Sequence, residues 1–349
     1  MTTPPIRIQR LLASLAALAL SAAAAACGTA AKSTSSHSQA ATSGKSTATT
    51  IEAAAHASGP TLRVGDQAGT GAQALLQAAG LLRSFSFPIT FNDFTSGPPI
   101  LQAMSAGSLD IGNTGNAPPV FAAAGGANIK IVGALSNANS DVGLLVPKNS
   151  KVTSVSQLKG RKIAVAQGSS ADYHLLYVLK QAGLTAHDVQ LVYLQPAQGL
   201  AAFESGAVDA WDVWPPFIEQ ARLLQGARVL VAGQHFTGNY SYEVASSSAL
   251  SDPAKAREIR QYLTVLNRAH RWANHHSAAW ARTWASATGL PLTVMQRAAA
   301  DTTQTPVPVN ATITSAEQGL VTLFSKAGLI PRAYSFTPFT TPAFNASVN

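Results

Sequence analysis

The sequence of 349 residues has one cysteine, Cys27, and few charged side chains, with Asp, Glu, Lys and Arg together at 11%. A single cysteine excludes a disulfide within the chain. The basic residues are scattered and form no arginine-rich stripe, so the net charge of +8 is weak support for a nucleic-acid partner. We therefore expect neither a disulfide scaffold nor a protein that binds nucleic acid.

Hydrophobic residues make up 46% of the chain, which is enough for large buried cores. A disordered chain would have far fewer apolar residues and more charge. The length suggests two domains, and the many alanines favour helices.

The first 27 residues have the pattern of a secretion signal. Arg7 and Arg10 precede an apolar run over residues 11–20, and small residues lead from that run to Cys27. The apolar run is too short to span a bilayer. A lone cysteine at this place resembles the bacterial lipoprotein pattern, in which the thiol is lipidated after cleavage, although Ala24 stands where leucine is usual. We expect a chain anchored outside the cytoplasm by Cys27, with a mature net charge of about +6.

Residues 28–60 are dominated by Ala, Ser and Thr and show no apolar periodicity. Such a composition cannot bury enough apolar surface to fold, so it predicts a flexible tether. We expect folding to start near Thr61.

From Thr61 onward the chain alternates strand and helix patterns. In the first stretch we expect strands at residues 62–65, 88–94, 109–112, 129–135 and 142–146, and helices at residues 72–82, 98–106 and 117–124. In the second we expect strands at residues 161–166, 189–194, 208–213 and 229–231, and helices at residues 171–182, 199–205 and 215–224. Residues 240–246 then favour an extended crossing segment, residues 253–284 a helical stretch, and the chain ends helically with a loose tail after Pro331.

This order predicts a two-lobed α/β clamshell. We expect lobe I to comprise residues 61–143 and 241–349, and lobe II residues 144–240. The chain would cross between them near residues 142–147 and 240–246. The cleft between the lobes is then the expected binding site of a monomeric protein.

Several turns between strands and helices carry small polar residues in place of charged ones. The first N–H groups of a helix have no partner within it, so converging helix N-termini can hold an anion without a lysine or arginine. Ser96 is a suitable N-cap, and proline pairs open the helices that follow Gly97 and Asn116. The backbone N–H of Ala171 would complete the cage. The candidate anion-binding residues are Gln67, Ser96, Gly97, Thr114, Gly115, Asn116, Gln167, Ser169 and Ser170.

Aromatic residues near the expected cleft could surround an organic tail. The candidates are Tyr173, Trp211, Trp214 and Phe217. We favour Trp214 at the cleft, because strand alternation turns Trp211 to another side, and Trp211 and Phe217 then belong to the core.

The sequence offers little support for an enzyme or for a metal-binding protein. His270, His275 and His276 have offsets that suit no common metal pair, and their neighbours suggest a solvated face. His174 follows the anion turn and could reach a ligand, but no nucleophile motif with a partner base is present. We expect no catalysis, no cofactor and no metal.

Three runs of sequence resemble the substrate-binding proteins of aliphatic-sulfonate ABC transporters. They are SGPPILQAMSAGSLDIGNTGNAPPVFAAAGG at residues 96–126, LKGRKIAVAQGSS at residues 158–170 and AAFESGAVDAWDVWPPF at residues 201–217. The resemblance implies a type II periplasmic-binding-protein fold that closes on an alkanesulfonate and delivers it to a permease driven by an ATPase, as a source of sulfur. Close relatives of that family bind nitrate, taurine or pyrimidine precursors. These ligands, and an anchored sensor, stay open as alternatives.

The chain departs from the family pattern where relatives often carry acids. Asn116 and Pro215 stand at two such positions. The second acid suits the amino group of taurine in taurine binders, so its loss argues against taurine. Asp66 and Asp212 lie nearby and could replace that acid for a cationic tail, or serve as caps or surface residues.

Overall fold

The computed structural model describes residues 49–51, 59–67, 71–137, 142–233 and 239–348. The expected signal segment, Cys27 and most of the expected tether lie outside the described residues. Within the described residues, no helix combines the length and the apolar character needed to cross a bilayer.

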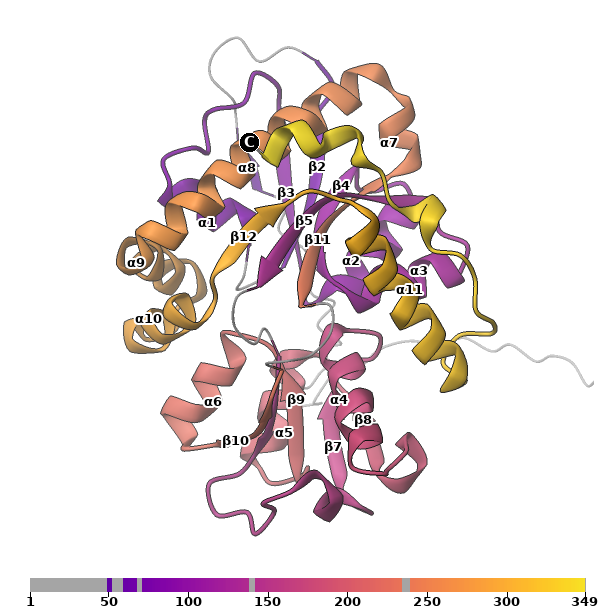
Figure 1. Cartoon of the computed structure of the whole chain (residues 1–349). Coiled ribbons are helices and arrows are strands. Elements are labelled where there is room, and N and C mark those ends of the chain that lie inside the picture. Colours follow the sequence, from indigo (N-terminus) through magenta and orange to yellow (C-terminus); the bar gives the residue numbers. More distant parts are fainter. Residues whose placement is uncertain (1–48, 52–58, 68–70, 138–141, 234–238, 349) are drawn as a thin grey trace, which may run out of the picture. The chain divides into compact units, whose positions relative to one another are not determined.

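The chain from Lys45 to Asn349 contains two sheets, each with its own helices (Figure 1). The seven-stranded sheet has the order β1-β3-β2-β4-β11-β5-β12, and the five-stranded sheet has the order β10-β6-β9-β7-β8. The strands of the first sheet are β1 (Thr49–Ile51), β2 (Leu62–Gln67), β3 (Ile89–Phe94), β4 (Ile111–Gly115), β5 (Ile129–Asn137), β11 (Tyr240–Ser246) and β12 (Gln304–Val307). Those of the second are β6 (Gly143–Val146), β7 (Lys162–Val165), β8 (Gln190–Tyr193), β9 (Ala210–Val213) and β10 (Arg228–Ala232).

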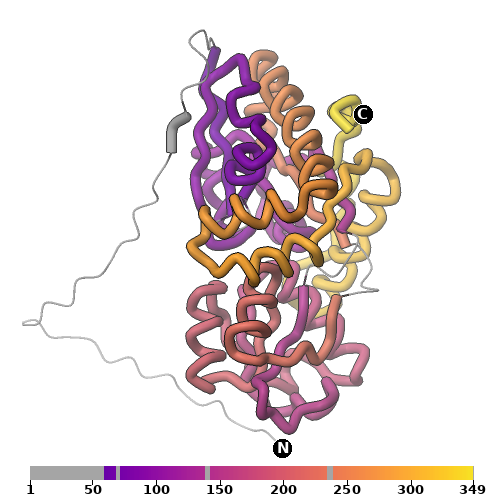
Figure 2. The backbone as a smooth tube through the Cα atoms, turned by 90° about the vertical axis from the view of Figure 1, so that its left-hand side faces the viewer, coloured from indigo at the N-terminus to yellow at the C-terminus, as the bar shows by residue number. Residues whose placement is uncertain are grey.

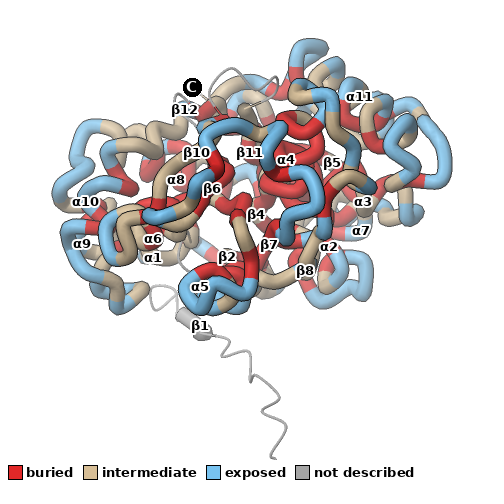
Figure 3. Tube along the Cα trace, turned by 90° about the horizontal axis from the view of Figure 1, so that it is seen from below, coloured by how far each residue is buried: buried red, intermediate tan, exposed pale blue. Residues whose placement is uncertain are grey.

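Helices cover both faces of each sheet. With the first sheet lie α1 (Ala72–Ala78), α2 (Gly97–Ser105), α3 (Ala117–Ala124), α7 (Ser247–Ser251), α8 (Pro253–His275), α9 (Ser277–Thr288), α10 (Leu292–Asp301) and α11 (Ala311–Lys326). With the second lie α4 (Ser170–Gln181), α5 (Pro196–Glu204) and α6 (Phe217–Gln225). Figure 3 shows the buried strands in the interior and the exposed residues on helices and turns. The expected two-lobed α/β fold is therefore confirmed.

Both sheets mix strand directions around a parallel centre. β2 runs parallel to β3 and β4, and β7 runs parallel to β8 and β9. β11 enters between β4 and β5 and is antiparallel to both. The carboxyl ends of the parallel strands therefore carry the turns that were expected to bind the ligand.

The crossings between the sheets come directly before the segments where we expected them, and the strand expected at residues 142–146 is present. Residues 142–147 include β6, and residues 240–246 are β11, so both are paired strands. The chain crosses between β5 and β6 and again between β10 and β11. Next to these crossings the Asn137 N–H donates to the Asn239 carbonyl at 3.0 Å, and Asn239 Nδ2 donates to the Asn137 carbonyl at 2.8 Å. An extended crossing segment and a paired strand have the same alternating pattern, so the sequence could not show that residues 240–246 form a strand.

Three other expectations were wrong. Within the expected tether, residues 49–51 form β1, which pairs with β3. The helical stretch over residues 253–284 is divided at His276 into α8 and α9. The tail after Pro331 is packed and not loose, because Phe336 and Phe344 are buried in the two cores of the first sheet. Aromatic residues without helical spacing gave no periodic signal there.

The two lobes touch each other on several sides. Tyr173 of α4 packs against Phe324 of α11, with ring centroids 5.6 Å apart, within the core beside the first sheet. Ser96 Oγ, before α2, donates to Gln195 Oε1, before α5, at 2.9 Å. Helices α6 and α10 also lie in contact, at the junction that Figure 2 shows from the side.

Candidate functional site

A cavity of about 140 Å³ lies between the two sheets. Its wall includes the ends of β2, β4 and the turn after β9, and the starts of α2 and α4. Of the ten residues expected to bind the ligand, six line it: Gln67, Gly97, Gly115, Ser169, Ser170 and Trp214.

One end of the cavity is built from small polar groups of both lobes. Ser169 is the N-cap of α4; its hydroxyl donates to the Ala166 carbonyl at 2.6 Å and accepts from the Asp172 N–H at 3.2 Å. The hydroxyl of Ser170 is buried and has no hydrogen-bond partner among the described residues. Gly115, on the opposite lobe, lies so close that a Cβ there would overlap the Ser170 hydroxyl.

Helix starts supply N–H groups to the same end. Gly97 begins α2 and lines the cavity, and the two prolines after it have no N–H. A Cβ on Gly97 would lie 2.9 Å from Pro118 Cγ and 3.1 Å from Thr114 Cβ, so a side chain would not fit there. The bare Gly97 backbone therefore faces the cavity where an anion would meet a helix N-terminus.

The other four expected residues do not line the cavity. The hydroxyl of Ser96 bonds to Gln195 instead of capping α2, and that of Thr114 donates to the Gly115 carbonyl at 3.0 Å. Asn116 is buried, and Gln167 is exposed. The sequence identified the right turns, but it could not show which side chain in each turn faces inward.

No lysine or arginine is among the described residues that line the cavity. The single histidine there, His270, is buried, and burial lowers its pKa to about 4, which keeps it neutral near pH 7. Our expectation that His270 lies on a solvated face was wrong, whereas His275 and His276 are exposed. The described residues contain no group of three His, Cys, Asp or Glu side chains placed to hold a metal.

Trp214 and a tryptophan pair form the apolar part of the wall. Trp280 and Trp284 of α9 stack with ring centroids 4.9 Å apart, and both line the cavity together with Leu75. Trp211 lies in the core of the second lobe, where Phe217 packs against it, and Tyr173 packs against the first lobe. The sequence pattern did not identify Trp280 or Trp284 because their spacing of four is that of any buried helix face.

Two acids line the cavity as well. Asp66, at the end of β2, is 2% exposed, and its carboxylate accepts the N–H groups of Gln67, Ala72 and Gln73 at 3.0, 2.8 and 3.0 Å. It therefore serves as the cap of α1, and burial raises its pKa to about 6. Glu243, in β11, is 3% exposed, and burial raises its pKa to about 7. Sequence analysis missed Glu243, although an acid in the middle of an apolar strand was a signal.

His174 and Asp212 pair with each other behind the cavity wall. His174 Nδ1 lies 2.7 Å from Asp212 Oδ2, and both side chains are almost fully buried. Neither is among the residues that line the cavity.

This two-lobed fold is shared with known proteins. The model of the family described as NMT1/THI5 like matches residues 95–278. A putative aliphatic sulfonates-binding protein of Escherichia coli (strain K12) is 35% identical over 289 residues, which cover 81% of this chain and 89% of that protein. The chain belongs to the NMT1/THI5-like family.

Two solved structures of similar sequence have the same fold. The alkanesulfonate-binding protein SsuA from Xanthomonas axonopodis pv. citri, bound to MOPS, has a TM-score of 0.76 at 33% identity, covering 82% of this chain and 99% of that chain. The periplasmic aliphatic sulphonate binding protein SsuA from Escherichia coli has a TM-score of 0.72 at 33% identity, covering 81% and 97%. These relatives are binding proteins and not enzymes, and this member of the NMT1/THI5-like family is likewise a binding protein that works outside the cytoplasm.

Proposed function

We propose that this protein captures an alkanesulfonate in the cavity between its lobes and delivers it to an ABC permease with its ATPase, for sulfur acquisition. The observation that carries the proposal is the composition of the cavity wall. Small hydrogen-bond donors from both lobes meet at one end, and no lysine or arginine is among the described lining residues.

This wall suits the chemistry of a sulfonate. The group is fully ionised at physiological pH and carries no proton, so it needs donors and gains nothing from an acceptor. Ser170 Oγ, which has no partner among the described residues, and the helix starts at Gly97 and Ser170 provide donors without a lysine or arginine. A phosphate ester keeps a proton over much of the pH range and would tolerate an acceptor beside it.

The apolar wall suits the organic part of the same ligand. Trp214, Trp280, Trp284 and Leu75 also line the cavity, and apolar lining residues are common in clefts for small molecules. Two relatives named for binding sulfonates, one of them bound to the sulfonate MOPS, support this ligand class.

The proposal extends to the two lobes and to the anchor. Lobe I is built on the seven-stranded sheet and lobe II on the five-stranded sheet, and they close on the anion by rotation at the two crossings. Cleavage of the signal before Cys27 and lipidation of its thiol would hold the protein at the outer side of the cell membrane, with residues 28–60 largely as a tether. Relatives named as periplasmic support the location.

Calorimetric titration of the full-length protein in a mild detergent tests the ligand class. The panel is ethanesulfonate, longer alkanesulfonates, taurine, nitrate, sulfate and a pyrimidine precursor. Saturable binding of sulfonates supports the proposal. If every sulfonate fails while another ligand binds, the protein serves a different branch of the family.

Metabolic labelling with a clickable fatty acid tests the anchor. The parent chain should be labelled and should sediment with membranes, whereas the Cys27→Ala variant should be unlabelled. Equal labelling of both chains would contradict lipidation at Cys27.

A further inference from the structure

Glu243 places a partly unpaired carboxyl on the wall of the cavity. It lies in β11 between β4 and β5, at 3% exposure. Its Oε1 accepts from Asn113 Nδ2 at 2.9 Å, and its Oε2 has no hydrogen-bond partner among the described residues. A buried carboxyl oxygen without a donor is costly, so a partner from the ligand would stabilise it.

The protein itself supplies no cation to Glu243 from the cavity wall. No lysine or arginine is among the described lining residues, and His270 is neutral near pH 7. The second acid, Asp66, already accepts three backbone N–H groups, one from Gln67 in β2 and two from Ala72 and Gln73 at the start of α1. Asp212, which the sequence offered as a replacement acid, is paired with His174. Glu243 is thus the acid with capacity left for a ligand.

We propose that Glu243 binds a cationic amine on the ligand's tail, so that the site takes zwitterionic aminosulfonates. This inference rests on the proposed sulfonate function. The sulfonate would meet the small donors at Gly97 and Ser170, and the ammonium would meet Glu243. An ammonium has three N–H donors, enough for a carboxylate oxygen and for contact with the ring face of Trp280 or Trp284, which attracts cations.

The charged and titratable groups around Glu243 determine whether ligand binding releases a proton. From β2, Asp66 raises the pKa of Glu243 beyond the effect of burial; from α8, Tyr262 and His270 face this region uncharged near pH 7. With a pKa of about 7, Glu243 is partly protonated at neutral pH. An ammonium binds the ionised form, so binding an aminosulfonate releases a proton, and binding an uncharged tail does not.

The test compares two ligands of equal length, 3-aminopropanesulfonate and butanesulfonate, by calorimetry on the full-length protein. The parent should bind the amine more tightly. Glu243→Gln should weaken the amine roughly 30-fold or more and leave butanesulfonate unchanged or tighter. Glu258→Gln is the matched control, because Glu258 is also a buried glutamate but does not line the cavity. An equal loss for both ligands in Glu243→Gln would overturn the inference.

A measurement on the parent protein keeps the inference testable if the variant does not fold. Titrations in buffers of different ionisation enthalpy should show proton release for 3-aminopropanesulfonate and none for butanesulfonate. Tighter binding of butanesulfonate, or equal proton release, overturns the aminosulfonate inference alone. Absence of binding by both ligands overturns the proposed function and the inference with it.

Discussion

The backbone of Gly115, at the end of β4, lies against the hydroxyl of Ser170, the first residue of α4 on the other lobe. Because a methyl group at Gly115 would overlap that hydroxyl, this glycine sets how closely the lobes approach at the cavity. Small residues are therefore required here by the contact between lobes, and not by an unusual backbone conformation.

Gly115→Ala should weaken sulfonate binding by roughly 10-fold or more, because the added methyl must push Ser170 away. The thermal midpoint should change little, since the clash is relieved by a small separation of the lobes. Calorimetry and thermal unfolding measure the two effects. Gly319→Ala, in α11, is the matched control, because a Cβ there meets no atom within 4 Å. Native affinity in Gly115→Ala would contradict this role of the contact.

The neighbouring serines should separate binding from stability. Ser170→Ala removes a hydroxyl that has no partner among the described residues, so it should weaken sulfonate binding roughly 10-fold and leave stability unchanged. Ser169→Ala removes the N-cap of α4 and should lower the free energy of unfolding by about 1 kcal/mol. Calorimetric titration measures sulfonate affinity and urea unfolding measures stability in both variants. Weaker binding in Ser169→Ala and lower stability in Ser170→Ala would contradict the roles assigned to the two serines.

The sequence predicted those elements that have a local pattern and missed those that depend on contacts between distant residues. Proline pairs before helices and alternating strands are local patterns, so the strand-to-helix turns at Gly97 and Ser169 were found from the sequence. The antiparallel insertion of β11 between β4 and β5 depends on long-range pairing, which leaves no local trace, so residues 240–246 were expected to be a connector.

The same error hid part of the candidate site. Once residues 240–246 are a strand, alternation places Ser241 and Glu243 together, and both line the cavity. Trp280 and Trp284 reach the cavity through the packing of α9, which spacing on one helix cannot indicate. Ser96 and Thr114 were expected there because hydroxyls suit an anion, but each hydroxyl has a nearer acceptor.

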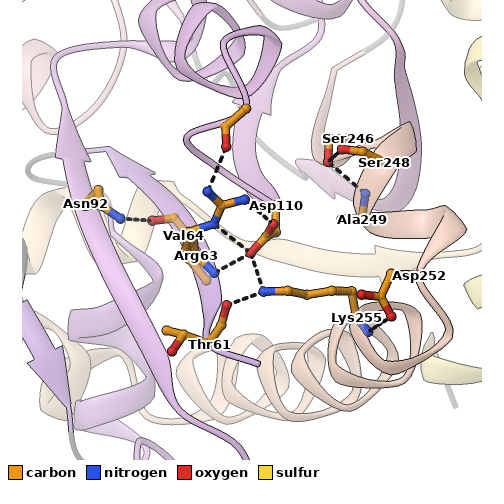
Figure 4. A network of polar contacts seen from close by, with 11 residues as sticks. Thr61, Arg63, Val64, Asn92, Asp110, Ser246, Ser248, Ala249, Asp252 and Lys255 are labelled. Atoms are coloured by element: carbon orange, nitrogen blue, oxygen red, sulfur yellow. Dashed lines mark hydrogen bonds and ion pairs between the residues drawn. The ribbon is translucent and has the colours of Figure 1, made fainter. Parts of the chain in front are cut away.

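A salt-bridge cluster away from the cavity should affect stability alone. Asp110 accepts from Arg63 Nη2 at 2.7 Å and from Lys255 Nζ at 2.8 Å, and Lys255 also donates to the Thr61 carbonyl (Figure 4). Asp110→Asn should lower the free energy of unfolding by about 2 kcal/mol, since it leaves Lys255, 12% exposed, without its anion. Sulfonate affinity should stay unchanged, because Asp110 does not line the cavity.

The pH dependence of that cluster has a definite sign. Bonds to Arg63 and Lys255 hold the pKa of Asp110 below its usual value despite its burial. Its contribution to stability is therefore present above a pH of about 4 and is lost as the pH falls below that value. Urea unfolding of the parent and Asp110→Asn at pH 3 and pH 7 should show a larger difference at pH 7. An equal difference would mean that the charge of Asp110 contributes nothing.

Glu243 should give the opposite dependence. Burial raises its pKa from 4.5 to about 7, so between these values the folded protein holds a proton that the unfolded chain gives up. The parent therefore loses stability as the pH rises from about 4.5 to about 7 and loses no more above that range. Glu243→Gln removes this titration, so the variant should gain about 3 kcal/mol in free energy of unfolding relative to the parent between pH 4.5 and pH 8. Urea unfolding across this range measures the difference.

A pH-independent difference between the parent and Glu243→Gln would mean that this carboxyl titrates alike in the folded and unfolded chains. Saturating 3-aminopropanesulfonate adds a second prediction. An ammonium beside Glu243 would stabilise the ionised carboxylate and lower its pKa, so the loss of stability between pH 4.5 and pH 7 should become smaller for the liganded parent. Butanesulfonate at the same saturation should leave that slope unchanged, because its tail brings no charge to the buried acid.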